Sequence, residues 1–458
     1  GPCRAGETLG YHHHVLRRRS AVHHGPAQRA VALLTLAVFL SACATTQLPP
    51  ISAAGPGFEP LRDERALWAA ARTEEERLLE GVRVYQDPLL VDYLEDLVAG
   101  LNPPSMAANR EVRYRVTVVE DPTLNAFAYP HGSLYLHTGL LARMENEAQL
   151  ATVLGHEMTH VENRHMIRHR RAARNRQIAL TAVAVAAAVV VAGEAGDAIE
   201  QGNYSRAARI ELLSDLLLSL GLTLAFIASV NGYGRGLEEE ADRGGFVKLA
   251  AAGYDPAEAP KVYQTLMEDY GDSGKLEAFF FGSHPQLARR IDGARAWLAA
   301  HPPAAGEEEA APPTLGDEER FARRIRPVVR DDARLNLELG RLELAEVELD
   351  KVLDWMPEDP EAWLLRARLR LAQADLDQDP AVRDLLRSEA KDALYEAVRL
   401  DAERPAPHRE LGLLLYREGD RRGACREIGH YLELAPEADD APRMRDYLLE
   451  LEQAGECR

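Results

Sequence analysis

The sequence predicts a mainly α-helical protein with a small β-sheet in its N-terminal half and a solenoid of helical repeats in its C-terminal part. The chain has 458 residues, which is enough for two or three domains. Two short segments between residues 114 and 137 alternate like strands, whereas helical spacing dominates elsewhere and acquires a fixed period after residue 319. The formal net charge of -19 excludes the basic surface that binding nucleic acid requires, so no nucleic acid is expected as a partner.

Residues 1–42 have the features of a lipoprotein signal peptide. Basic residues precede a short apolar run at residues 30–40. The segment "LSAC" that follows resembles the lipidation site of bacterial lipoproteins, which implies a lipid on Cys43 that anchors the chain to a membrane. Ala44 and Thr45 follow in place of Asp, and by the same resemblance this implies the periplasmic face of the outer membrane. An uncleaved anchor is the alternative. Residues 43–60 are rich in Pro, Gly and Ala and predict a flexible tether.

Residues 61–300 are expected to form one domain. The segment "YRVTVVE" at residues 114–120 predicts a strand, and a turn leads to a second strand near residues 133–137. A helix begins near Asn146 and has one apolar face. Two apolar stretches follow, at residues 178–192 and 216–230. Both are shorter than the roughly 20 residues of a membrane helix, so we expect buried core helices, with a membrane-dipping hairpin as the alternative.

Residues 301–319 are rich in Pro, Ala and Glu and predict a linker, after which residues 320–458 have tetratricopeptide spacing. Gly419 and Ala424 stand at the offsets of this motif, and Gly340 and Ala345 stand at the same offsets in an earlier repeat. A middle repeat carries an insertion of about 14 residues within residues 374–387. Stacked helix pairs of this kind form a concave surface that suits a peptide.

The segment "HEMTH" at residues 156–160 gives the central helix a chemical function. Residues four apart project from one face of a helix, so His156 and His160 can bind one Zn²⁺ together. Zn²⁺ makes a bound water acidic, and Glu157 is placed to take its proton. His165 and His169 lie beyond this segment on the same helical pattern. We assign them either to the surface or to positions behind the metal ligands.

A catalytic zinc needs a third protein ligand. The segment "GLEEEAD" at residues 236–242 offers three glutamates, and spacing alone cannot choose among them. Glu238 and Asp242 share one helical face. One of them could therefore bind the metal while the other orients a ligand histidine through a hydrogen bond.

Four segments together resemble the HtpX and CAAX prenyl protease family of zinc metallopeptidases. They are "NAFAYPHGSLYLHTGLL", "NEAQLATVLGHEMTHVENRH", "YGRGLEEEAD" and "SHPQLARRI". Within this family, the chain is similar to periplasmic members that assist β-barrel assembly and add C-terminal tetratricopeptide repeats. The resemblance implies a helical, zincin-type metallopeptidase domain that binds one Zn²⁺ per chain.

The resemblance also implies roles for individual residues. Glu238 would be the third metal ligand, and Asp242 and Arg290 would support the ligands from behind. His284 would stabilise the oxyanion or occupy the open metal position. Three consecutive residues would line the substrate cleft at the edge of a strand: Asn125, Ala126 and Phe127.

By the same resemblance, we expect a periplasmic zinc endopeptidase that degrades unfolded or misassembled outer-membrane proteins. The repeats would dock the substrate or the barrel-assembly machinery. One alternative is a repeat-based periplasmic chaperone or scaffold with a latent peptidase domain. Another is an inner-membrane peptidase in which the apolar stretches are embedded. In an oxidising periplasm Cys425 and Cys457 can form a disulfide bond, and two free thiols are the alternative.

Overall fold

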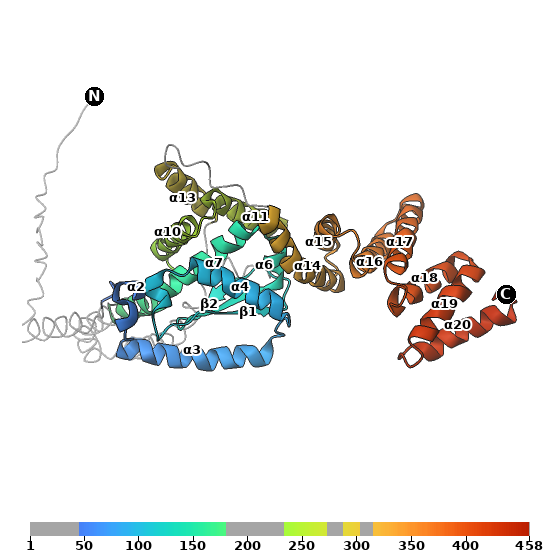
Figure 1. Cartoon of the computed structure of the whole chain (residues 1–458), viewed down its shortest axis with the longest axis horizontal. Helices are drawn as coiled ribbons and strands as arrows, with labels where there is room; N and C mark the ends of the chain where they lie inside the picture. The colour runs from blue at the N-terminus through green and yellow to red at the C-terminus, as the bar shows by residue number, and fades with distance from the viewer. Residues whose placement is uncertain (1–44, 180–232, 273–286, 303–314, 458) are drawn as a thin grey trace, which may run out of the picture. The chain divides into compact units, whose positions relative to one another are not determined.

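The computed structural model describes residues 45–179, 233–272, 287–302 and 315–457 (Figure 1). Cys43, His284 and almost all of the two apolar stretches lie outside these residues. Within the described ranges, no helix combines the length and the apolar character that crossing a membrane requires.

Local capping signals in the sequence begin several of the helices. Asp87 accepts hydrogen bonds from two backbone N–H groups at the start of α4, and Asn146 does the same for one N–H group of α7, where the sequence predicts a helix start. The helices of the N-terminal domain are α3 (Arg62–Gly81), α4 (Pro88–Leu101), α5 (Pro104–Ala107), α6 (Thr138–Arg143), α7 (Glu147–Glu162), α10 (Arg235–Ala251), η2 (Pro256–Glu258), α11 (Ala259–Asp272) and α13 (Leu287–Ala300).

Three strands form a small sheet in the order β1-β3-β2, and the two predicted strands are confirmed. β1 (Arg115–Val119) runs parallel to β3 (Ser133–His137), whereas β2 (Ala126–Ala128) is antiparallel to β3 and forms an edge. Leu134 and Leu136 enter the helical core, while Tyr135 points to the other face and donates a hydrogen bond to Glu75 of α3. Figure 1 shows α3 on one side of the sheet and α4 and α7 on the other.

The predicted flexible tether is wrong at its C-terminal end, because residues 51–58 are folded. A short helix, α2 (Ile51–Ala54), leads into a 3-10 turn, η1 (Gly55–Gly57). Ile51 and Phe58 are the large apolar residues of this stretch, and both are buried. They pack in one cluster with other buried side chains: Trp68, Met106, Val112 and Val161. Removing two large apolar side chains from water offsets the entropy of ordering the segment.

The C-terminal part consists of three helical hairpins and a final helix. These helices are α14 (Leu315–Glu338), α15 (Leu342–Trp355), α16 (Pro360–Leu376), α17 (Pro380–Leu400), α18 (Pro405–Glu418), α19 (Arg421–Leu434) and α20 (Ala441–Gln453). Gly340 and Gly419 have positive φ angles of 72° and 86° in the turns of the first and third hairpins. The predicted insertion lengthens the middle hairpin, in which α16 has 17 residues and α17 has 21. A helical repeat region is confirmed, and its tetratricopeptide assignment stays a prediction.

The first hairpin shares its core with the N-terminal domain. One hydrophobic cluster contains buried residues of α4, α6, α7, α14 and α15. The described part of α14 starts at Leu315, so residues 315–319 of the predicted linker at residues 301–319 are helical. The boundary differs because the apolar face of α14, which includes Phe321 and Ile325, is buried in this cluster.

A buried polar cluster also joins the two parts. Arg143 at the end of α6 donates a hydrogen bond to Glu348 of α15 at 3.0 Å, and Asn336 donates to both Glu348 and Asp332. Burial, with the neighbouring Glu348 charge, raises the pKa of Asp332 well above its ordinary value. Lys351 donates to two carbonyl groups at the end of α6. These contacts tie the repeats to the helix that directly follows β3.

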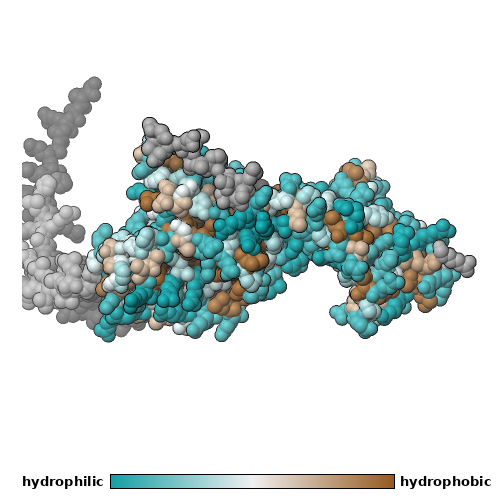
Figure 2. Space-filling model, in the orientation of Figure 1, coloured by the Kyte–Doolittle hydropathy of each residue, from teal (hydrophilic) through white to brown (hydrophobic). Residues whose placement is uncertain are grey.

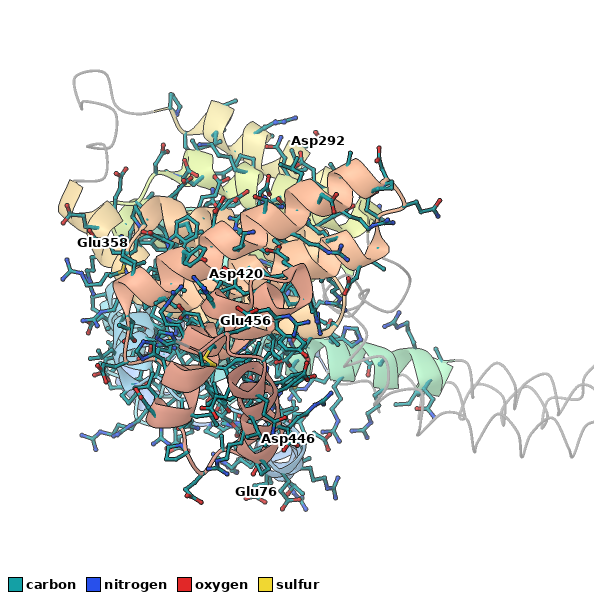
Figure 3. All side chains as sticks on the ribbon, turned by 90° about the vertical axis from the view of Figure 1, so that its right-hand side faces the viewer. Glu76, Asp292, Glu358, Asp420, Asp446 and Glu456 are labelled. Atoms are coloured by element: carbon teal, nitrogen blue, oxygen red, sulfur yellow. A yellow bond between two sulfur atoms is a disulfide. The ribbon has the colours of Figure 1, made fainter. Side chains whose placement is uncertain are left out.

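Cys425 and Cys457 form a disulfide bond, which Figure 3 shows close to the labelled Glu456. Their Cα atoms are 5.5 Å apart, and the bond joins α19 to the segment that follows α20. The bond therefore closes a loop around the last turn and holds α20 against the third hairpin.

We expect the double variant Cys425→Ser/Cys457→Ser to lose about 3–4 kcal/mol of unfolding free energy in the C-terminal hairpin region, because the bond restricts the unfolded chain. Denaturant unfolding followed by circular dichroism measures this loss. Reductant should destabilise the wild type to the same extent and leave the variant unchanged. Alkylation of both thiols in unfolded, unreduced wild type would contradict the bond.

Candidate metal centre

Helix α7 carries the "HEMTH" segment through the core of the domain. Leu150, Leu154 and Met158 of this helix are fully buried in the hydrophobic cluster. His156 and Glu157 are also buried, with exposed fractions of 3% and 2%. Burying ionisable groups costs free energy unless they have partners. Their place in this helix is therefore better explained by a site than by packing.

The structure brings the three predicted metal ligands together. His156 Nε2 and His160 Nε2 are 3.0 Å apart, and the Glu238 oxygens lie 3.6 Å from the first atom and 3.5 Å from the second. Atoms bound to a tetrahedral zinc at about 2.0–2.2 Å would stand about 3.3–3.6 Å from one another. The three residues therefore fit a tetrahedral divalent ion and would supply three of its four ligands.

Glu238 reaches the histidines because α10 crosses α7 at glycines. A Cβ atom on Gly245 would lie 3.2 Å from the His156 backbone nitrogen, and one on Gly244 would lie 2.4 Å from the Thr159 side chain. Gly155 of α7 faces Gly245 across the same crossing. Larger residues at these positions would separate the two helices. The "GG" pair therefore sets the distance between the carboxylate and the imidazoles.

Asp242 holds the ring of His156 from behind. Its Oδ1 atom accepts a hydrogen bond from His156 Nδ1 at 2.8 Å, which leaves Nε2 directed towards the other ligands. Arg290 and Tyr263 donate to the same carboxylate at 2.7 and 2.8 Å. Burial raises the pKa of Asp242, but the Arg290 charge and the bond from His156 outweigh burial and hold the pKa well below its ordinary value.

The protonation state of His156 suits a metal ligand. Burial, together with the Arg290 charge, lowers the pKa of His156 to about 4. The imidazole is then neutral at neutral pH, which is the form that binds a metal. The predicted roles of Asp242 and Arg290 behind the ligands agree with this geometry.

The structure also distinguishes the three glutamates of α10. Glu238 is buried beside the imidazoles, whereas Glu239 is exposed and pairs with Arg243. Glu240 turns towards the end of α7 and accepts a hydrogen bond from Arg168 at 2.8 Å. The three glutamates therefore differ in burial, and this difference identifies Glu238 as the ligand where sequence spacing could not choose.

The edge strand β2 lies beside α7. Its pairing with β3 leaves the backbone N–H and C=O groups of Ala126 and Ala128 pointing away from the sheet. The Phe127 ring stacks on Tyr135 at a centroid distance of 5.0 Å, on the face of the sheet away from α7. Phe127 therefore contributes backbone to this strand, and its side chain does not face the metal ligands. Asn125 is buried at the start of the strand.

Some residues of the centre were not singled out from the sequence. Tyr233 stacks on His160 with ring centroids 4.1 Å apart, and Tyr263 bonds Asp242. Tyr233 opens the segment "YGRGLEEEAD" but was given no role there, and Tyr263 lies outside the four segments, so only the fold reveals their contacts with the centre. His165, for which two positions were left open, is fully buried behind His160.

Comparison with known proteins agrees with this geometry. Residues 88–298 match the model of peptidase family M48. The chain is 31% identical over 188 residues to the mitochondrial metalloendopeptidase OMA1 of Schizosaccharomyces pombe, a match that covers 41% of this chain and 48% of that protein. Beta-barrel assembly-enhancing proteases are similar at 28% identity: that of Yersinia pestis over 48% of this chain and 42% of its own length, and that of Escherichia coli over 46% and 39%.

The matched region spans less than half the length of these relatives. It contains the two histidines and the glutamate of the centre, and the family model ends within α13. The sequence-based assignment to this class of metallopeptidase is confirmed. Residues 88–298, which hold the candidate metal centre, are therefore similar to peptidase family M48.

Proposed function

We propose that this chain is a zinc-dependent endopeptidase. The observation that carries the proposal is the buried set of His156, His160 and Glu238, whose ligand atoms lie within 4.8 Å of one another. Two imidazoles and one carboxylate suit Zn²⁺, whereas Mg²⁺ and Ca²⁺ prefer oxygen ligands. The buried Glu157 next to His156 supplies the base that peptide hydrolysis needs.

The residues of the chain divide the work of hydrolysis. When bound, Zn²⁺ would polarise the peptide carbonyl and acidify the attacking water. Glu157 takes one proton from this water as its oxygen bonds to the carbonyl carbon. As the C–N bond breaks, Glu157 returns the proton to the leaving amine and regains its starting form. Asp242 and Arg290 keep the His156 ring fixed meanwhile.

The edge of β2 would align the substrate. An extended peptide can add to this edge through the free backbone groups of Ala126 and Ala128. The Asn125 side chain is 1% exposed, and neither of its polar atoms has a hydrogen-bond partner among the described residues. Buried amides are normally paired, so a substrate backbone amide is a suitable partner. A small hollow lined by Ala128, Trp68 and His160 adjoins this edge.

We expect Glu157→Gln to lower casein hydrolysis by roughly 10²–10⁴-fold, because the amide cannot accept the proton. Zinc content, measured by atomic emission, should stay at one ion per chain. Glu239→Gln is the matched control, since Glu239 is exposed on α10 and outside the ligand set. Equal hydrolysis by wild type and Glu157→Gln would contradict the assigned base.

Asp242→Asn should weaken Zn²⁺ binding by roughly 10–100-fold, because the neutral amide no longer balances the buried Arg290 charge and is a weaker acceptor for His156 Nδ1 than the carboxylate. Competition with a chromophoric chelator measures the affinity. Asp292→Asn is the control: Asp292 is exposed on α13, two residues from Arg290, and is labelled in Figure 3. Unchanged affinity in Asp242→Asn would show that the support of His156 is dispensable.

We further propose that the enzyme works in the periplasm, anchored to the outer membrane through Cys43, on outer-membrane proteins that fail to assemble. Two of the relatives named above are beta-barrel assembly-enhancing proteases, which supports this class of substrate. The disulfide between Cys425 and Cys457 supports an oxidising compartment. The mitochondrial relative named above indicates that the domain alone does not fix the location.

The helical repeats would dock the substrate or the barrel-assembly machinery. Figure 2 shows hydrophobic residues among the hydrophilic ones over the C-terminal helices. Several large apolar side chains there are exposed around the turn of the long middle hairpin: Leu376, Val382 and Leu385. Exposed apolar groups next to one another are typical of surfaces that bind a partner.

A Glu157→Gln chain should retain bound substrates that wild type cleaves. Crosslinking in cells followed by mass spectrometry should recover outer-membrane β-barrel proteins with Glu157→Gln and fewer of them with wild type. Recovery of equal sets from both chains, or of inner-membrane proteins alone, would contradict the proposed substrates.

Cys43→Ala should move the chain from the membrane fraction to the soluble periplasmic fraction.

A further inference from the structure

A turn at the end of α7 places His165 behind the metal ligand His160. α7 ends at Glu162, and the chain is helical again from residue 165. Five residues along an unbroken α-helix correspond to a rotation of about 140°, which would point His165 away from His160. In the structure, His165 Nδ1 lies 2.9 Å from His160 Nδ1, and His165 is 0% exposed.

The chemistry of a metal ligand fixes the direction of this hydrogen bond. His160 presents Nε2 to the other ligands, so a metal-binding ring carries its proton on Nδ1. His160 Nδ1 therefore donates and His165 Nδ1 accepts. The proton of a neutral His165 is then on Nε2, which lies 3.5 Å from Glu240 Oε1. Behind His160, the His165 imidazole comes first and the Glu240 carboxylate lies next to it.

Glu240 is itself held in place. Its Oε1 atom accepts hydrogen bonds from Arg168 at 2.8 Å and from the Asn163 amide at 3.0 Å. Glu240 lies two residues after Glu238, so α10 supplies both the third ligand and the support behind His160. Asp242, from the same helix, accepts the hydrogen bond of His156.

The turn depends on an unusual backbone conformation at Arg164. Its φ angle is 58°, and no other non-glycine residue in the described part of the chain has a positive φ. This conformation is unfavourable for an L-residue, and such strain persists where the surroundings enforce it. Glu64 of α3 accepts bonds from two Arg164 nitrogens, at 2.9 and 2.5 Å. Lys248 Nζ of α10 donates a hydrogen bond to Oε2 of the neighbouring Glu162 at 2.5 Å.

We propose that His165 and Glu240 are positioning residues for the ligand His160, and that the left-handed turn at Arg164, locked by Glu64, puts His165 in reach. The inference rests on the proposed metal site and assigns the second ligand a support of its own. Substituting these residues would therefore loosen the metal without removing any ligand.

The test is Zn²⁺ affinity, measured on the full chain by chelator competition, with thermal unfolding of the metal-free chain as a second readout. His165→Leu has no acceptor for His160, and its affinity should fall roughly 10–100-fold. His165→Asn can accept through its side-chain oxygen and should retain most of the affinity. His408→Leu is the matched control: this buried histidine pairs with Glu427 in the repeats, so only stability should fall.

Two variants at Arg164 separate the turn from the ion pair. Arg164→Gly and Arg164→Val both remove the guanidinium from Glu64, but only glycine adopts a positive φ without strain. The glycine variant should therefore bind Zn²⁺ more tightly than the valine variant. Tight wild-type binding with unchanged affinity in His165→Leu, or equal affinity in the two Arg164 variants, would overturn this inference alone. A wild-type chain that binds no Zn²⁺ would overturn the proposed function as well.

Discussion

The centre depends on the close crossing of α7 and α10. Hydrogen at Gly244 and Gly245 in place of a side chain lets the helix axes approach until one helix offers two imidazoles and the other a carboxylate. The same approach buries the ionisable groups, which would be unfavourable for each of them alone. Asp242, Arg290 and Tyr263 offset this cost by pairing with one another and with a ligand ring. The contact between α7 and α10 therefore determines both how the two helices pack and how far the ligand atoms lie from one another.

The two histidines are held by different means. His156 is hydrogen-bonded to the Asp242 carboxylate of α10, whose charge is balanced by Arg290 of α13. His160 contacts a second histidine, His165, which is placed by the turn that ends α7. Two hydrogen bonds hold this turn: Arg164 donates to Glu64 of α3, and Glu162 accepts from Lys248 of α10. Elements far apart in the sequence thus converge on a pair of rings that are only four residues apart.

Much of this could be predicted from local patterns. The spacing of "HEMTH" indicates two imidazoles on one helical face, and alternation indicates the strands, because both depend on fixed backbone periods. Spacing could not choose among the glutamates of α10, since their difference is burial against another helix. It also extended the helical pattern to His165, because nothing local shows that Arg164 adopts a left-handed conformation. The tether was misjudged since two apolar side chains outweighed the flexible composition around them.

The polar cluster between α6 and α15 bears on how such chains can evolve. Arg143 and Glu348 lie on opposite sides of what the sequence presents as a domain boundary, yet they form an ion pair at 3.0 Å in which the Glu348 side chain is 1% exposed. Replacing α15 with a helix that lacks Glu348 would remove this ion pair from Arg143. The first hairpin is therefore matched to the N-terminal domain, whereas substitutions in the later hairpins leave this ion pair in place.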